Sequence, residues 1–125
     1  MIATFAAWIF AAASAGTVAF HGAVIVGAPW GRLTMGGRWP GQLPLPARLL
    51  TASSALLLVL LAAVVLAQVY RPAGLPRWAI WGVVVLMGVA VVANAATPSA
   101  PERLLWLPVV VVMLACSVTV ALARR

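Results

Sequence analysis

The sequence predicts an all-α membrane protein, a bundle of four transmembrane helices with a long first loop rich in Gly, Pro and Trp. Of its 125 residues, 66% are hydrophobic and 7% are charged, whereas soluble domains have about half and about a quarter. Four apolar runs are each long enough to cross a bilayer. Because lipid offers no partner to the backbone, runs of this kind cross as helices.

The first apolar run covers residues 2–28 and carries no charged side chain. At 1.5 Å per residue it is about 40 Å long, more than the roughly 30 Å hydrocarbon core requires. The stretch Ala13-Ser14-Ala15 has the small residues of a signal-peptide cleavage site, but a basic leader is missing and the apolar run continues beyond it. We therefore expect a transmembrane helix here.

Small residues recur every fourth position along this first helix and predict a slanted packing face. They are Ala7, Ala11, Ala15, Ala19, Ala23 and Gly27.

The other three helices are expected at residues 47–70, 76–96 and 102–123. Residues 71–75 and 97–101 connect them through short segments that contain proline, a residue that ends helices. Short connections of this kind predict that consecutive helices are antiparallel neighbours.

The first loop, residues 29–46, is much longer and contains four prolines and four glycines. It also contains two tryptophans, so it is too apolar for a solvated linker. We expect it at the level of the lipid headgroups or folded back over the bundle. Both an interfacial anchor without a ligand and a binding lid agree with this composition.

The charge is strongly unbalanced, with eight arginines, no lysine and one glutamate. The arginines flank the apolar runs, so they predict topology and contact with the lipid bilayer, including anionic headgroups, and no nucleic-acid partner. Together with the abundant Ala, Val and Gly, they indicate a bacterial cytoplasmic membrane. Both termini are expected in the cytoplasm, although the arginines on the two sides nearly cancel and insertion in both orientations stays open.

Most polar side chains are predicted to gather on the first-loop side of the membrane. Buried ionisable groups are costly in lipid, so this cluster is the candidate ligand site. Its members are His21, Arg32, Arg38, Asn94, Thr97, Glu102 and Arg103.

The roles of the two rarest side chains stay open at this point. His21 has three alternatives: structural pairing with Asn94, Thr17 or a backbone carbonyl, contact with a ligand, or proton transfer. Glu102 suits the start of a helix or a pair with Arg32, Arg38 or Arg103. With no Asp or Lys and one His, we expect no catalytic set, no metal site and no cofactor.

Several short stretches resemble a family of small four-helix bacterial membrane proteins of uncharacterised activity. The resemblance implies four helices and brings no activity with it. It rests on Gly27-Ala28-Pro29-Trp30-Gly31, Thr34-Met35-Gly36-Gly37-Arg38, Pro40-Gly41, Leu43-Pro44, Asn94, Thr97-Pro98-Ser99, Glu102-Arg103, Trp106 and Pro108.

These observations favour a non-enzymatic binding or accessory protein with a polar pocket on the first-loop side. The arginine excess favours a small anionic or lipid-headgroup ligand. A homo-oligomeric channel or transporter is the alternative, and a membrane enzyme comes third. A homo-oligomer, or an accessory subunit of another membrane protein, is expected.

Overall fold

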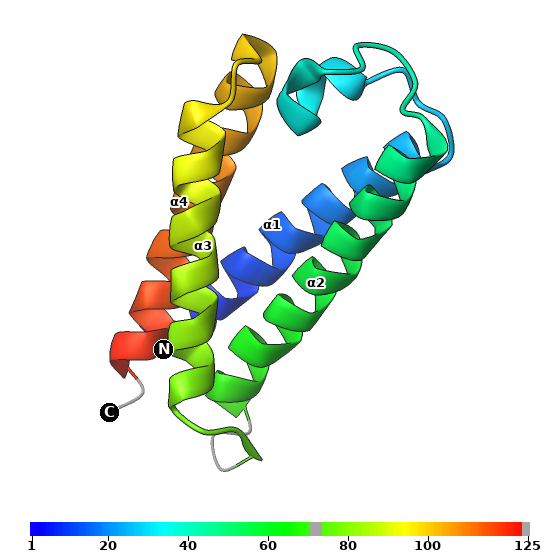
Figure 1. Cartoon of the computed structure of the whole chain (residues 1–125). Coiled ribbons are helices and arrows are strands. Elements are labelled where there is room, and N and C mark those ends of the chain that lie inside the picture. Colours follow the sequence, from blue (N-terminus) through cyan, green and yellow to red (C-terminus); the bar gives the residue numbers. More distant parts are fainter. Residues whose placement is uncertain (71–73, 124–125) are drawn as a thin grey trace.

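A computed structural model describes residues 1–70 and 74–123 of the chain (Figure 1). Within them four long helices follow one another: α1 (Ile2–Ile25), α2 (Leu45–Tyr70), α3 (Trp78–Ala96) and α4 (Ala100–Ala123). Two short 3-10 turns, η1 (Gly31–Leu33) and η2 (Met35–Gly37), lie in the first loop, and no strand forms in this part of the chain. The predicted all-α fold class is therefore confirmed.

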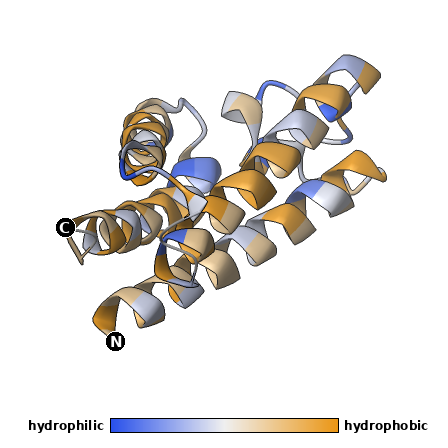
Figure 2. Cartoon of the chain, turned by 90° about the horizontal axis from the view of Figure 1, so that it is seen from below, coloured by the Kyte–Doolittle hydropathy of each residue, from blue (hydrophilic) through white to orange (hydrophobic). Residues whose placement is uncertain are grey.

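The four helices are long and apolar enough to cross a membrane. Large apolar side chains such as Leu60, Val85 and Val89 point outward and are more than half exposed. Figure 2 shows hydrophobic residues along much of each helix. A surface of this kind is stable against lipid and unfavourable against water, so the chain has the features of a multi-pass membrane protein.

The helix ends differ from the predicted ones by two or three residues. Helix α1 ends at Ile25 and not at residue 28, because Gly27 takes a φ of +114° that no helix continues through. Helices α2 and α3 begin at Leu45 and Trp78, where residues 47 and 76 were expected.

Helix α4 begins two residues earlier than predicted because Ser99 caps it. The backbone N–H of Glu102 donates to Ser99 Oγ at 3.4 Å, the pairing of an N-cap residue with the third residue of its helix. Pro101 is tolerated in the first turn, where its missing N–H would have no acceptor within the helix.

The helices form two pairs that diverge toward the first loop. Helix α1 packs along α2 and also against α4, and α3 packs along α4. As predicted, α3 and α4 are neighbours; α2 and α3 are also in contact, but much less extensively. Figure 1 shows the α3–α4 pair separating from α2 toward the end that carries η1 and η2.

The main core lies at the end away from the first loop, where the pairs meet. Phe10, Val65, Ile80 and Val120, one from each helix, are almost completely buried there. Because lipid is as apolar as these side chains, close packing holds them together. At the same end Trp8 Nε1 donates to the Tyr70 hydroxyl at 2.7 Å, which joins α1 to α2.

The small residues of α1 form a contact face only in part. Ala7 is fully buried, but Ala15 and Ala19 are exposed. They line a shallow groove beside Val59 and Ala62 of α2. Because a four-residue step drifts around the helix, the stripe leaves the interface halfway along.

The first loop crosses from α1 to the start of α4 and folds back over the bundle. The N–H of Gly31 donates to the carbonyl of Gly41 at 2.9 Å, and a Cβ on Gly31 would lie 1.7 Å from the Trp39 carbonyl oxygen. Only glycine permits this approach. The loop is fixed to α4 by Trp106 Nε1, which donates to the Leu33 carbonyl at 2.8 Å.

Candidate functional site

Glu102 joins the first loop to the start of α4. Its Oε2 accepts hydrogen bonds from the N–H of Gly36 at 2.8 Å and from the Thr97 hydroxyl at 3.0 Å. The N–H reaches the carboxylate because Gly36 has a φ of +69°, in the left-handed region that glycine favours. Ser99 Oγ adds a bond to the Arg32 carbonyl at 2.5 Å. The predicted helix-start position of Glu102 thus also holds the loop in place.

The arginines of the predicted cluster do not face this carboxylate. Arg103 donates from Nη1 to the Thr97 carbonyl at 2.7 Å. Arg38 is exposed and its guanidinium lies 4.9 Å from the centre of the Trp39 ring, a cation–π arrangement. Arg32 is also exposed. Among residues 1–70 and 74–123, Glu102 is held by neutral donors instead of the ion pairs that the sequence left open.

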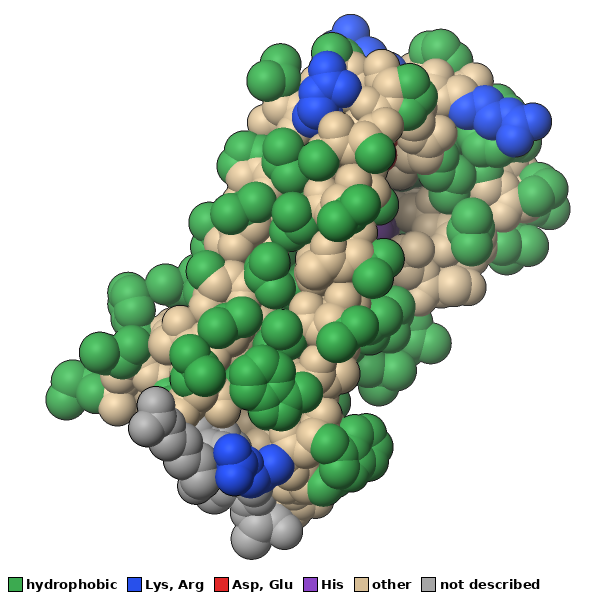
Figure 3. All heavy atoms as spheres, turned by 60° about the vertical axis from the view of Figure 1, so that its left-hand side comes forward, with side chains coloured by type: hydrophobic (Ala, Val, Ile, Leu, Met, Phe, Trp, Pro, Cys, Tyr) green, Lys and Arg blue, Asp and Glu red, His purple; other side chains and the backbone are tan. Residues whose placement is uncertain are grey.

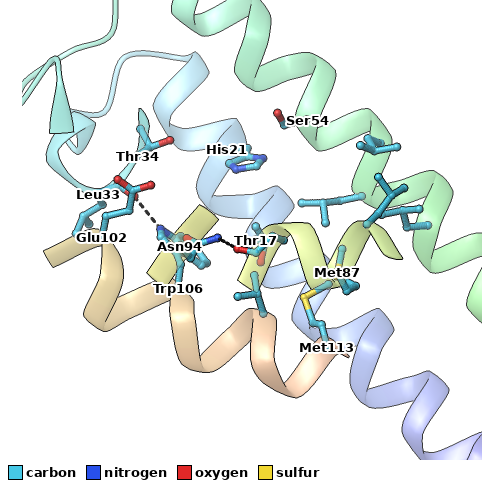
Figure 4. A pocket seen from close by; sticks show the side chains of 16 residues that line it. Thr17, His21, Leu33, Thr34, Ser54, Met87, Asn94, Glu102, Trp106 and Met113 are labelled. Carbon is cyan, nitrogen blue, oxygen red and sulfur yellow. Dashed lines mark hydrogen bonds between the residues drawn. The ribbon is translucent and has the colours of Figure 1, made fainter. Parts of the chain in front are cut away.

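A cavity of about 310 Å³ lies beneath the loop, between the two helix pairs (Figure 4). All four helices and the first loop contribute to its wall. The lining side chains are Thr17, His21, Leu33, Thr34, Ser54, Leu57, Leu58, Leu61, Leu86, Met87, Ala90, Asn94, Glu102, Trp106, Val110 and Met113. Its volume is at the lower end of the range for small-molecule sites.

His21 projects from α1 into this cavity, between Ser54 of α2 and Asn94 of α3 in the view of Figure 4. Its Nδ1 is buried and has no hydrogen-bond partner within the described residues. The amide of Asn94 donates instead to the Ala90 carbonyl at 2.8 Å, and the Thr17 hydroxyl donates to the Ala13 carbonyl. The structural pairings expected for His21 are therefore not formed, and its Nδ1 is a buried polar atom that lacks a hydrogen bond.

An aromatic cluster supports the helix turn that carries His21. Phe20 lies with its ring centre 4.8 Å from that of Trp106, edge to face, and 6.0 Å from that of Trp30, nearly parallel. Such pairs add roughly 0.5–1.5 kcal/mol each beyond their buried area. The cluster joins α1, the first loop and α4, and it fixes the position from which the imidazole projects.

The cavity opens sideways between α2 and α3. Leu57 of α2 and Leu86 of α3 line it and are 45% and 42% exposed, so they form its rim. Figure 3 shows the imidazole of the only histidine within a hollow among apolar side chains. The opening thus lies between two of the helices that are long and apolar enough to cross a membrane.

Of the predicted cluster, His21, Asn94 and Glu102 line the cavity. Thr97 holds Glu102 from behind, and Arg32, Arg38 and Arg103 lie outside the lining. The sequence did not indicate that Ser54, Thr34 and Trp106 belong to the site. Nothing in the sequence around these three residues distinguishes them from other polar or aromatic positions. They line one cavity because the two helix pairs diverge.

Arg48 has a positioning role that the sequence did not indicate. Its Nε donates to the Leu43 carbonyl at 2.7 Å and its Nη1 to the Ile25 carbonyl at 3.4 Å. The end of α1 and the start of α2 are thereby joined beside the second small core of Val24 and Ala47. An arginine at the start of an otherwise apolar helix is the only signal of this role in the sequence.

No protein-family model, curated protein or solved structure matches this chain. Its function therefore has to be inferred from its own geometry, and the resemblance to the four-helix family stays a prediction.

Proposed function

We propose that this chain is a non-enzymatic binding protein that holds a small membrane-soluble molecule in the cavity beneath the first loop. The unpartnered, buried Nδ1 of His21 carries this proposal. A buried polar atom without a partner costs about 1–3 kcal/mol, and a ligand that bonds to it would remove that cost. The cavity around it is walled by all four helices and tapers into apolar side chains.

The arrangement favours binding over catalysis. The hydroxyls of Thr17 and Ser54 donate to carbonyls one turn earlier in their own helices, so neither is placed for activation by His21. Glu102, the only carboxylate side chain, holds the first loop through Oε2, which accepts from Gly36 and from Thr97. The lining thus has hydrogen-bonding groups without a paired nucleophile and base.

The ligand reaches the site from the bilayer. The rim leucines, Leu57 and Leu86, present the opening to the hydrocarbon region. On the loop side, Leu33 and Thr34 line the cavity, and the loop is fixed to α4 through Glu102 and Trp106. A molecule dissolved in the membrane therefore has a shorter path to His21 than one dissolved in water.

The proposed setting is the cytoplasmic membrane of a bacterium, with both termini in the cytoplasm. Arg32 and Arg38 are exposed at the first-loop end and suit contacts with anionic headgroups at that surface. A homo-oligomer or an accessory role is supported by the exposed Ala15 and Ala19, whose small size permits close approach of another transmembrane helix. The partner surface we propose is thus lipid and protein, not nucleic acid.

Native mass spectrometry of the protein in nanodiscs cut directly from the producing membrane tests the binding function. We expect the wild-type protein to carry a small molecule of defined mass. Ala90→Leu fills the cavity and should lose that molecule, whereas Ala93→Leu, at an exposed position one turn further along α3, should keep it. A wild-type protein without a bound molecule, or equal retention in both variants, would contradict the proposal. The same spectra give the stoichiometry.

A further inference from the structure

Most donor groups of the polar side chains that line the cavity already form hydrogen bonds within the protein. Thr17 donates to Ala13, Ser54 to Leu50 and Asn94 to Ala90, each to a backbone carbonyl four residues earlier. Trp106 donates its indole N–H to Leu33. The oxygens of Thr17, Ser54 and Asn94 remain as acceptors, so the wall offers more acceptors than donors.

The charges of the lining residues also disfavour an anionic ligand. Glu102 is the one ionisable acid of the wall, and among the lining residues there is no arginine. A carboxylate or phosphate head in the cavity would meet the like charge of Glu102 with no arginine in the lining to pair with it, and a poorly paired charge is very costly in a space of low polarity. The arginine excess that favoured an anionic ligand lies outside the cavity.

A hydroxyl group complements this wall. It can donate to the Nδ1 of His21 in the tautomer where that nitrogen accepts, or to the free oxygens of Ser54 and Asn94, and it can accept from the unused hydroxyl of Thr34 or from the imidazole. Because hydroxyls are uncharged, they are also less costly to transfer from the bilayer than an ammonium group.

The lower part of the cavity accommodates one apolar chain. Leu58, Leu61, Met87 and Met113 form its floor, and methionine adapts readily to the shape of a flexible tail. A volume of about 310 Å³ suits a single chain and not the two chains of a phospholipid.

We propose that the cavity binds a single-chain amphiphile with an uncharged, hydrogen-bond-donating head, of the long-chain alcohol class, which enters between α2 and α3. The hydroxyl lies at His21 and the tail on the leucine and methionine floor. This inference rests on the proposed binding function and adds the chemical class of the ligand.

Photolabelling with two matched probes tests this inference. One is a long-chain primary alcohol with a diazirine in its chain, and the other is the alkyl sulfonate of the same chain length, which is a permanent anion. The full-length protein is placed in phosphatidylcholine nanodiscs, irradiated with each probe and analysed by mass spectrometry. We expect the alcohol to label the floor residues Leu61, Met87 and Met113 at least about tenfold more than the sulfonate does, the ratio that one hydrogen bond to a buried group provides.

Substitutions at His21 separate the head contact from the tail contact. His21→Leu should reduce labelling of the floor by the alcohol several-fold, and His21→Gln, which keeps an acceptor and a donor, should restore part of it. Labelling of Leu60, which faces lipid on α2 and is 54% exposed, should be the same in all variants and reports that the protein is folded in the bilayer.

The outcomes distinguish the two proposals. Equal labelling of the floor by alcohol and sulfonate would overturn the inference about the head and leave the binding function in place. No labelling of the floor above the level of Leu60 by either probe would overturn the binding function, and the inference with it. Alcohol labelling that is unchanged in His21→Leu would overturn the assignment of the head to His21.

Discussion

At the scale of single residues, the site is built from positions where one atom decides the geometry. Gly31 allows Trp39 and Gly41 to approach its backbone, and Glu102 holds the loop through the N–H of Gly36. His21 differs from both, because its buried nitrogen has no partner in the described part of the chain. Gly31 and Glu102 maintain the shape of the loop over the cavity, and His21 provides the atom to which a ligand would bond.

Replacing Glu102 should weaken the attachment of the first loop. Glu102→Ala leaves the N–H of Gly36 and the Thr97 hydroxyl without their acceptor, at a cost of about 1–3 kcal/mol. Glu102→Gln keeps an acceptor oxygen and should cost less, because hydrogen bonds to a neutral group are weaker. The measurement is the thermal midpoint in detergent, followed with a thiol-reactive dye that reaches buried Cys116, the only cysteine, on unfolding. An unchanged midpoint in Glu102→Ala would count against this role.

Gly31 and Gly41 form a matched pair for a second prediction. Gly31→Ala places a methyl group 1.7 Å from the Trp39 carbonyl oxygen, so the loop has to move. The free energy of unfolding should therefore fall by about 1–3 kcal/mol. Gly41→Ala meets nothing within 4 Å and should be nearly neutral. The same dye assay compares the two midpoints. Similar midpoints for both variants would show that the loop does not have this close approach.

At the scale of helices, the sequence predicts that each helix exists better than it predicts where the helix ends and which helices it packs against. The length and apolar character of each run identify all four helices, because lipid leaves the backbone no other choice. The earlier start of α4 depends on Ser99 as a cap, which hydropathy does not register. The weak contact of α2 with α3 depends on the packing of α1 against α4, which joins the two helix pairs, and no property of the short connection determines it.

The opening between α2 and α3 gives a prediction at this scale. Leu57→Trp or Leu86→Trp narrows the rim and should slow labelling of the cavity floor by the diazirine alcohol several-fold. Leu60→Trp adds the same bulk on the lipid-facing side of α2 and should leave the rate unchanged. Time courses of irradiation after probe addition measure this. Equal rates in all three variants would place the access route elsewhere.

At the scale of the whole molecule, two helix pairs are joined by a core at one end and by the first loop at the other. His21, Asn94 and Glu102 were predicted to share a side of the membrane, and the structure brings them to one cavity. The sequence could predict this because depth follows from position along a helix. It could not predict which arginines face inward, since a long side chain at a helix end is free to turn to the surface, as Arg32 and Arg38 do.

The proposed orientation, with both termini in the cytoplasm, needs a direct test because the arginines on the two sides of the membrane nearly cancel. A reporter fused after residue 125 should give a cytoplasmic signal, because both termini are proposed on that side. A fusion placed within the first loop, after Gly41, should report from the opposite side. A purely periplasmic signal from the C-terminal fusion would reverse the orientation, and signals from both sides would indicate dual insertion.

Contact between a membrane-soluble molecule and His21 can be measured directly. Because the chain has one histidine, solid-state NMR of protein with nitrogen-15 histidine in lipid bilayers gives one pair of ring-nitrogen signals. Dodecanol labelled with carbon-13 at its hydroxyl-bearing carbon then serves as the probe. We predict magnetisation transfer between that carbon and the imidazole nitrogens, lost in Ala90→Leu and kept in Ala93→Leu. A folded wild-type protein whose imidazole shows no contact with the probe would contradict the proposed binding at His21.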